Sequence, residues 1–224
     1  MSDSQLRGRD DVAYLAPMAV FLLFTQIGVW WPQIYAVSYV ARTIIVALLL
    51  MVFWKHYTKI CWDYWWLGAL MGVVGVVQWV GMEKLLLHVV PHYPRLSVEP
   101  YNPMTAIASP GWRWAFVGVR WAGASLLVPV MEELFWRDFA WRSIIAPADF
   151  KLAAVGELDW AAIALVALLF ASLHVQWITA LVWGSMIAGL LVLTRSLGAC
   201  IIMHGMTNFL LGLYVLKTGE WYFW

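Results

Sequence analysis

Polar side chains that could carry out hydrolysis interrupt three apolar stretches in the second half of this sequence. They are Glu132, Glu133 and Arg137 in the first stretch, His174 in the second, and His204 and Asn208 in the third. Ionisable residues in such stretches are energetically costly and usually functional. A carboxylate with a histidine can polarise water, and a histidine with an amide can stabilise a developing oxyanion. These residue types suffice to hydrolyse a peptide bond without a covalent intermediate.

Helical spacing predicts different roles for the two adjacent glutamates. Glu133 and Arg137 are four residues apart, so they share a helix face and can pair. Glu132 points about 100° away and has no obvious partner within its own helix. A buried carboxylate without a cation is a candidate general base or acid. Pro129 removes a backbone hydrogen bond just before the pair, which predicts a local kink.

The other polar residues follow the same four-residue spacing. Phe170 and His174 share one face of their helix, and His204 and Asn208 share one face of theirs. Each signal alone has an ordinary structural interpretation: a packed histidine, an ion pair, or an asparagine that joins two helices. Their occurrence together on three separate spans favours one shared functional site.

Composition defines the class of protein in which this site lies. The chain has 224 residues, of which 63% are hydrophobic and only 12% are charged, with a mean hydropathy of +0.76. A soluble domain is about half apolar and about one quarter charged. The formal net charge of +1 suggests no nucleic-acid partner, and Cys61 and Cys200 have no disulfide or metal-ligand spacing. We therefore expect an all-α, polytopic bundle of transmembrane helices.

Apolar stretches of about 20 residues predict about seven spans, with a range of six to eight. They lie near 13–31, 34–54, 65–83, 121–142, 160–175, 178–194 and 198–217, and the fifth is short. Residues 1–12 form a polar N-terminal tail and 13–224 a single membrane domain. Five prolines forbid one continuous helix in segment 84–120, although a short interfacial helix fits near 113–120.

Small residues predict close helix packing at two places. They are Gly68, Gly72 and Gly75 in the third span, and Ser185 and Gly189 in the sixth.

The distribution of Lys and Arg favours a cytoplasmic N-terminus. Glu132 and His204 then lie near the cytoplasmic ends of their helices, and His174 near the outer end of its own, roughly ten ångströms away in depth. The fifth span must therefore stop within the bilayer, or the turn at 175–178 must be re-entrant. We expect the site to open to the cytoplasm or to lie mid-bilayer. Arg42, inside the second span, would snorkel or pair with an acid such as Asp138.

The ordered motifs EExxxR, FxxxH and HxxxN resemble those of the CPBP family of intramembrane proteases, which includes the CAAX prenyl endopeptidases. The resemblance covers about residues 121–217. It implies that Glu132 activates the attacking water and that His174 helps to hold it. It also implies that His204 and Asn208 stabilise the oxyanion, while Glu133, Arg137 and Phe170 support the site.

The resemblance does not decide whether the hydrolysis uses a metal ion. Glu132, His174 and His204 could form a zinc site with two histidines and one carboxylate. No HExxH motif is present, and we favour metal-independent chemistry without a cofactor.

A narrower resemblance concerns ELFWR at 133–137 and the C-terminal segment 207–224. Both resemble CAAX-protease-related proteins of exosortase sorting systems in Gram-negative bacteria. This implies an inner (plasma) membrane location, a protein or peptide substrate, and exosortase-system components as partners. The chain departs from many family members at Asp138, where a glycine is common. That acid could compete with Glu133 for Arg137.

Other classes of function fit part of the pattern. His174 and His204 could be the axial ligands of a b-type haem, but haem explains neither the glutamates nor Asn208. A transporter would use intramembrane Glu and Arg, yet the sequence has no inverted repeat. A non-catalytic membrane chaperone could keep the same residues for binding alone.

Overall fold

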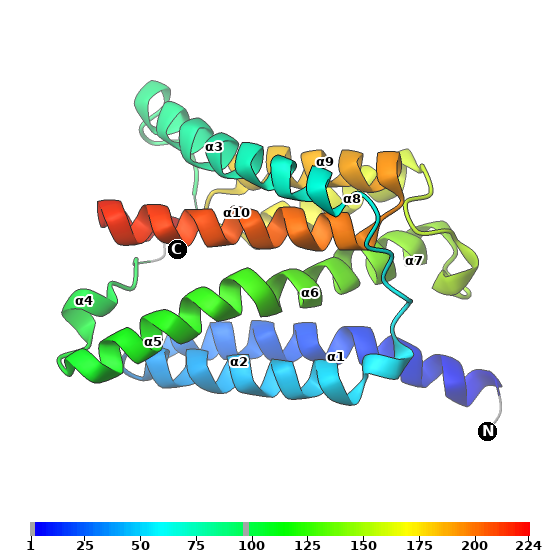
Figure 1. The fold of residues 1–224 in the computed structure, drawn as a ribbon, viewed down its shortest axis with the longest axis horizontal. Helices are drawn as coiled ribbons and strands as arrows, with labels where there is room; N and C mark the ends of the chain where they lie inside the picture. Colours follow the sequence, from blue (N-terminus) through cyan, green and yellow to red (C-terminus); the bar gives the residue numbers. More distant parts are fainter. Residues whose placement is uncertain (1–2, 96–98) are drawn as a thin grey trace.

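The computed structural model describes residues 3–95 and 99–224, and this part of the chain contains helices and no strand. The long helices run roughly along one axis (Figure 1). They include α1 (Asp3–Trp30), α2 (Tyr35–Val52), α3 (Trp65–Val89), α9 (Trp177–Thr194) and α10 (Leu197–Thr218). Within the described chain, six helical segments are long and apolar enough to cross a membrane, and the shorter α8 (Trp160–Ser172) is a seventh apolar helix. The predicted polytopic helical bundle is confirmed.

One continuous helical segment, Pro110–Ile145, carries the EExxxR motif. It consists of α5 (Pro110–Ala122), a π-helical turn (Gly123–Leu127), α6 (Val128–Glu133), a second π-helical turn (Leu134–Ala140) and α7 (Trp141–Ile145). The helix expected near 113–120 is present as α5, but it is not a short isolated helix because it continues into the segment that carries EExxxR. Pro110 begins the helix at a position where its missing N–H costs nothing, and no proline follows until Pro129.

Pro129 lies two residues after the last residue of the first π-helical turn. The Val128 N–H, which follows this turn, donates to the Gly123 carbonyl, five residues back. Widening the helix by one residue is a known way to accommodate a proline inside a transmembrane helix. The irregularity predicted at Pro129 is therefore present in the form of this turn.

The glycines of α3 bring that helix into close contact with α10. A Cβ atom at Gly72 would lie 2.5 Å from the Met206 Cβ, and one at Gly75 would lie 2.5 Å from the Thr207 Oγ1. The Thr207 hydroxyl in turn donates to the Gly72 carbonyl at 3.1 Å. The packing role predicted for these glycines is confirmed.

In α9 the predicted small-residue contact is wrong. Ser185 is exposed, and no atom lies within 4 Å of a Cβ added at Gly189. The inward face of this helix instead carries Trp183, Gly184 and Ile187. Gly184 allows the Phe170 ring to approach within 3.3 Å of the position a Cβ would take.

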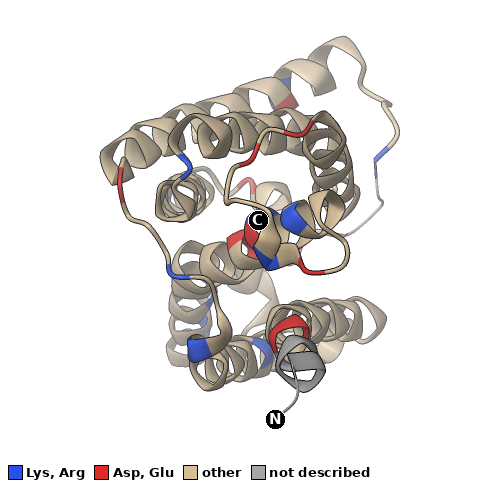
Figure 2. Ribbon diagram, turned by 90° about the vertical axis from the view of Figure 1, so that its right-hand side faces the viewer, with Lys and Arg blue, Asp and Glu red and all other residues tan. Residues whose placement is uncertain are grey.

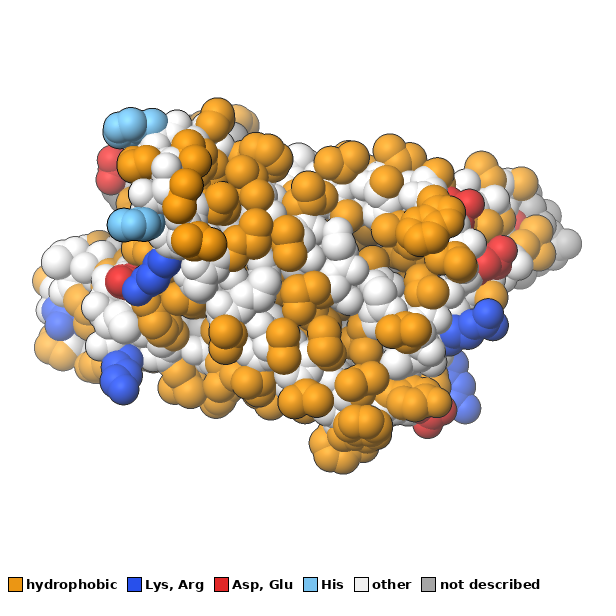
Figure 3. Space-filling model, turned by 90° about the horizontal axis from the view of Figure 1, so that it is seen from above, with side chains coloured by type: hydrophobic (Ala, Val, Ile, Leu, Met, Phe, Trp, Pro, Cys, Tyr) orange, Lys and Arg blue, Asp and Glu red, His pale blue; other side chains and the backbone are white. Residues whose placement is uncertain are grey.

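The surface is that of a multi-pass membrane protein. Hydrophobic side chains cover the middle of the molecule, and charged side chains gather at its two ends (Figure 3). Viewed from the end that carries the N-terminus, most of the ribbon of the long helices is free of Lys, Arg, Asp and Glu (Figure 2). The opposite end holds α4 (Pro103–Ala106) and the C-terminus (Figure 1).

We predict that Gly72→Val destabilises the protein because the added side chain meets α10. Overpacking of this kind costs about 1–3 kcal/mol. Gly81→Val is the matched control, since it lies on the same helix with nothing within 4 Å of its added Cβ. Thermal unfolding of the detergent-purified variants measures the difference. Equal midpoints for the two variants would contradict this role of the α3–α10 contact.

Candidate functional site

Glu133 is the fully buried centre of the polar groups in the bundle. Its carboxylate accepts a hydrogen bond from the Arg137 Nη1 at 3.3 Å, and its other oxygen lies 3.3 Å from the Arg137 Nε. The His204 Nδ1 lies 2.8 Å from the Glu133 Oε1. The predicted Glu133–Arg137 pair is confirmed, and the contact with His204 on α10 is an addition. Glu133 thus joins two of the three motifs directly.

A cavity of about 310 Å³ lies beside this ion pair. Four predicted catalytic residues line it: Glu132, His174, His204 and Asn208. Glu132 is 8% exposed, and no hydrogen bond to its carboxylate is found among the described residues. Glu133 thus contacts Arg137 and His204, whereas Glu132 lines the cavity without a hydrogen-bond partner in the described chain. The different roles of the two glutamates stay a prediction.

His174 lies in the turn that follows α8. Its Nδ1 lies 2.8 Å from the Phe170 carbonyl, to which it donates, so Nε2 is left as a hydrogen-bond acceptor. The four-residue FxxxH spacing is what allows this bond. The thirteen residues of α8 span only about 20 Å, so the predicted short fifth span is confirmed and the turn stands at the level of the cavity.

The Phe170 ring lies between several side chains of the site. Its centroid lies 4.4 Å from that of His174 and 5.6 Å from that of Trp183. The Arg137 guanidinium lies over it at 4.8 Å. Phe170 therefore keeps water from the Glu133–Arg137 pair while it positions His174.

Asn208 is held by the irregular backbone of the neighbouring helix. Its Nδ2 donates to the Ala124 carbonyl at 2.8 Å, within the first π-helical turn. One N–H of the amide is used in this way and the other is left. The amide therefore faces the cavity in one orientation.

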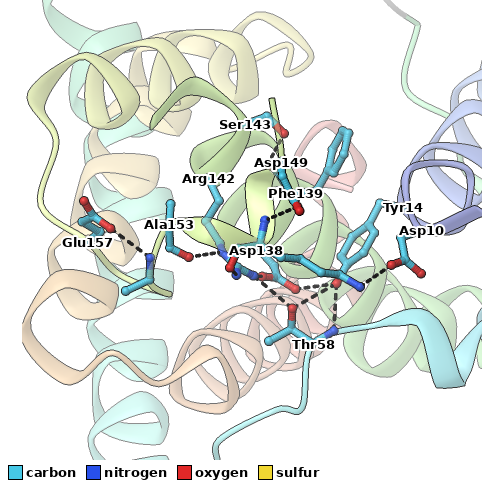
Figure 4. Close-up of polar contacts among 12 residues, drawn as sticks. Asp10, Tyr14, Thr58, Asp138, Phe139, Arg142, Ser143, Asp149, Ala153 and Glu157 are labelled. Carbon is cyan, nitrogen blue, oxygen red and sulfur yellow. Dashed lines mark hydrogen bonds and ion pairs between the residues drawn. The ribbon is translucent and has the colours of Figure 1, made fainter. Parts of the chain in front are cut away.

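Asp138 does not compete for Arg137, which corrects the prediction. It pairs with Arg142 and accepts a hydrogen bond from the Tyr14 hydroxyl at 2.7 Å. Arg142 also donates to Thr58 at 3.0 Å and to the Ala153 carbonyl at 2.8 Å. Figure 4 shows this second network, which ties α1 and two connections to the EExxxR helix. It lies apart from the cavity, and none of its members lines it.

Arg42 was expected to snorkel or to pair with an acid, and it does neither. It is 8% exposed, lines the cavity, and donates to the Thr25 hydroxyl. Its position in an apolar span was the available signal, but the face of α2 that turns inward could not be read from one sequence.

The C-terminal residues form one wall of the cavity, which sequence reasoning missed. Tyr222, Phe223 and Trp224 all line it, and the Gln176 side chain donates to the Tyr222 carbonyl at 2.7 Å. Desolvation raises the pKa of Tyr222 to about 12, so its hydroxyl stays protonated near neutral pH. The cavity therefore extends toward the end of the bundle opposite the N-terminus. The side of the membrane to which it opens stays a prediction.

The donors do not gather as a metal site. Among residues 3–95 and 99–224, no group of three His, Cys, Asp or Glu side chains is placed to hold a metal ion. The alternative zinc set of Glu132, His174 and His204 is thus not assembled in this arrangement. The His204 Nδ1 is already engaged by Glu133.

Comparison with protein families agrees with the motif geometry. Residues 112–210 match the family described as type II CAAX prenyl endopeptidase Rce1-like. The matched segment is less than half of the chain, and through it the chain is similar to the CAAX protease family. The match begins in α5 and ends in α10, so it contains all three motifs and every predicted site residue. No curated protein and no solved structure matches the chain.

At the family level, this match and the six candidate membrane spans of the described chain support an intramembrane peptidase of the CAAX type. The family match does not test the haem, transporter and chaperone alternatives, which stay predictions. A Soret band in the purified protein would identify a haem.

We predict that the two adjacent glutamates differ sharply in their effect on stability. Glu133→Gln leaves Arg137 without its counter-charge, and breaking a buried pair costs about 3–5 kcal/mol. Glu132→Gln removes no hydrogen bond and should change the free energy of unfolding by less than about 1 kcal/mol. Unfolding midpoints of the two purified variants test this. Similar losses would show that Glu132 is also a structural residue.

Proposed function

We propose that this protein is a membrane endopeptidase that uses Glu132, His174, His204 and Asn208 to hydrolyse a peptide bond. The observation that carries the proposal is the convergence of these side chains, from two helices and the turn after α8, on one cavity. Within it, Glu132 alone combines a negative charge with the absence of a hydrogen-bond partner in the described chain.

The first step is the activation of water. Glu132 removes a proton from a water molecule whose second hydrogen is bonded to the free Nε2 of His174. The water oxygen attacks the carbonyl carbon of the substrate, and the carbonyl electrons move onto its oxygen. Glu132 then gives the proton to the departing amine nitrogen as the carbon–nitrogen bond breaks.

The second requirement is a site for the negative charge that forms on the carbonyl oxygen. With its Nδ1 held by Glu133, His204 can present a protonated Nε2 as a donor. The remaining amide N–H of Asn208 is a second donor. Glu133 accepts the hydrogen bond from the His204 Nδ1, and Arg137 balances the charge of Glu133.

The cellular setting is also a proposal. The distribution of Lys and Arg supports a cytoplasmic N-terminus. The resemblance of residues 133–137 and 207–224 supports an inner-membrane location and a link to exosortase-system components. The substrate is a protein or peptide, and the chain shows no feature that requires it to be prenylated.

We predict that Glu132→Gln abolishes cleavage without loss of protein. General base catalysis contributes about 10²- to 10⁴-fold, so new termini should fall below detection. The measurement compares protein termini in membranes from cells that carry the wild type or the variant. Glu157→Gln is the control, because Glu157 accepts a hydrogen bond from the Ala154 N–H in a connection outside the cavity. Identical sets of termini at equal abundance would overturn the proposal.

We also predict metal-independent activity. The site has no assembled set of three metal ligands in the described residues, and the mechanism above uses side chains alone. Once a substrate is known, prolonged treatment of the purified protein with a chelator should change its rate by no more than about twofold. If a metal ion acted as a Lewis acid, its removal would instead cost several kcal/mol of transition-state stabilisation. A chelator-sensitive rate that zinc restores would favour the zinc mechanism.

A further inference from the structure

Arg42 is a buried cation on the wall of the cavity. It lies in α2, is 8% exposed, and no carboxylate lies within 4 Å of it in the chain as described. Two other buried arginines, Arg137 and Arg142, each pair with an acid four residues before them on the same helix. The side chain at 42 is thus a buried charge that no carboxylate contacts. It interacts with Glu132 across the cavity, and the proposed chemistry gives it no other task.

The immediate surroundings of Arg42 hold it in place without neutralising it. Its guanidinium lies over the Phe21 ring at 4.3 Å and over the Tyr39 ring at 4.1 Å. One nitrogen donates to the Thr25 hydroxyl. Aromatic faces stabilise a cation in place of water but leave the planar edge of the guanidinium unoccupied. That edge binds carboxylates with two parallel hydrogen bonds.

The position of Arg42 relates it to the reaction. It shares the cavity with Glu132, and it also lines a smaller void with Val128, one helical turn before Glu132. The two side chains also lie close enough for their charges to interact. A group bound at Arg42 would therefore lie near a peptide bond presented to Glu132.

From this arrangement, and resting on the proposed function, we propose that Arg42 binds a carboxylate of the substrate peptide. The carboxylate belongs to an Asp or Glu side chain or to a chain terminus, near the bond that is cleaved. Glu132 repels such a group from its own end of the cavity, and Arg42 attracts it to the other. Arg42 thereby selects acidic peptides and fixes the register in which they bind.

The test measures binding without hydrolysis, in purified protein that carries Glu132→Gln. The probes are three forms of one acetylated apolar pentapeptide: a free C-terminal carboxylate, a C-terminal amide, and the amide with one internal Asp. Binding is read from the rise of the unfolding midpoint with peptide concentration. Charged hydrogen bonds of this kind correspond to about tenfold to one-hundredfold in affinity, so at least one acidic peptide should exceed the neutral amide by that ratio. The acidic peptide that binds more tightly identifies the source of the carboxylate.

Variants at Arg42 show whether this side chain causes the preference for an acidic peptide. Adding Arg42→Gln should reduce the ratio to about one, and Arg42→Lys should retain only part of it, because an ammonium group lacks the two-pronged edge. Should the Gln variant fail to fold, the reduced ratio in the Lys variant carries the test. Arg120→Gln is the matched control, since Arg120 is also buried and packed on aromatic rings but does not line the cavity. In this control, the ratio of the affinities for the acidic and the neutral peptide should equal that of the protein with Glu132→Gln alone.

Two results would overturn the proposal. One is equal affinity of the three peptides, or no binding of any, in the protein that keeps Arg42. The other is a preference for acid that persists in Arg42→Gln. Neither result bears on hydrolysis by Glu132, which the comparison of termini tests separately.

Discussion

The site depends on how one negative charge is kept inside an apolar bundle. Glu133 is fully buried, and it persists there because Arg137 and His204 both contact its carboxylate. A charge without such partners would be far too costly at this depth. This requirement sets the rotation of α10 against the EExxxR helix. Because His204 must reach Glu133, its other nitrogen and the nearby Asn208 are presented to the cavity. The need to neutralise the buried Glu133 therefore determines how the side chains of the site are arranged.

Spacing along one helix could be predicted from the sequence, and contacts between helices could not. The Glu133–Arg137 pair follows from the period of the α-helix. The same period explains why Glu132 points away from that pair. The partner of His204 depends on how α10 is rotated. Asp138 was expected to compete for Arg137, but it pairs with Arg142, which lies four residues after it on the same helix. The inward face of α2, and hence the place of Arg42, had no sequence signal.

Backbone irregularity at several points creates room for polar groups. The π-helical turn before Pro129 positions the Ala124 carbonyl that holds Asn208. The early end of α8 leaves a turn at the level of the cavity, and this turn carries His174. Backbone of this kind is tolerated at membrane depth only where protein or a wet cavity surrounds it. The length of its apolar stretch predicted that α8 is short. The π-helical turn could not be predicted from the apolar pattern, and only the proline after it indicated an irregular backbone.

The glycine face of α3 has a consequence for the order in which the chain is assembled. That face fits against α10, which leaves the ribosome more than one hundred residues after α3 ends. Until then α3 can enter the bilayer but cannot dock, because its partner has not been synthesised. The same late helix supplies His204 and Asn208. The reactive cavity therefore closes only after α10 has been synthesised, and a chain that stalls before α10 lacks half of its reactive groups.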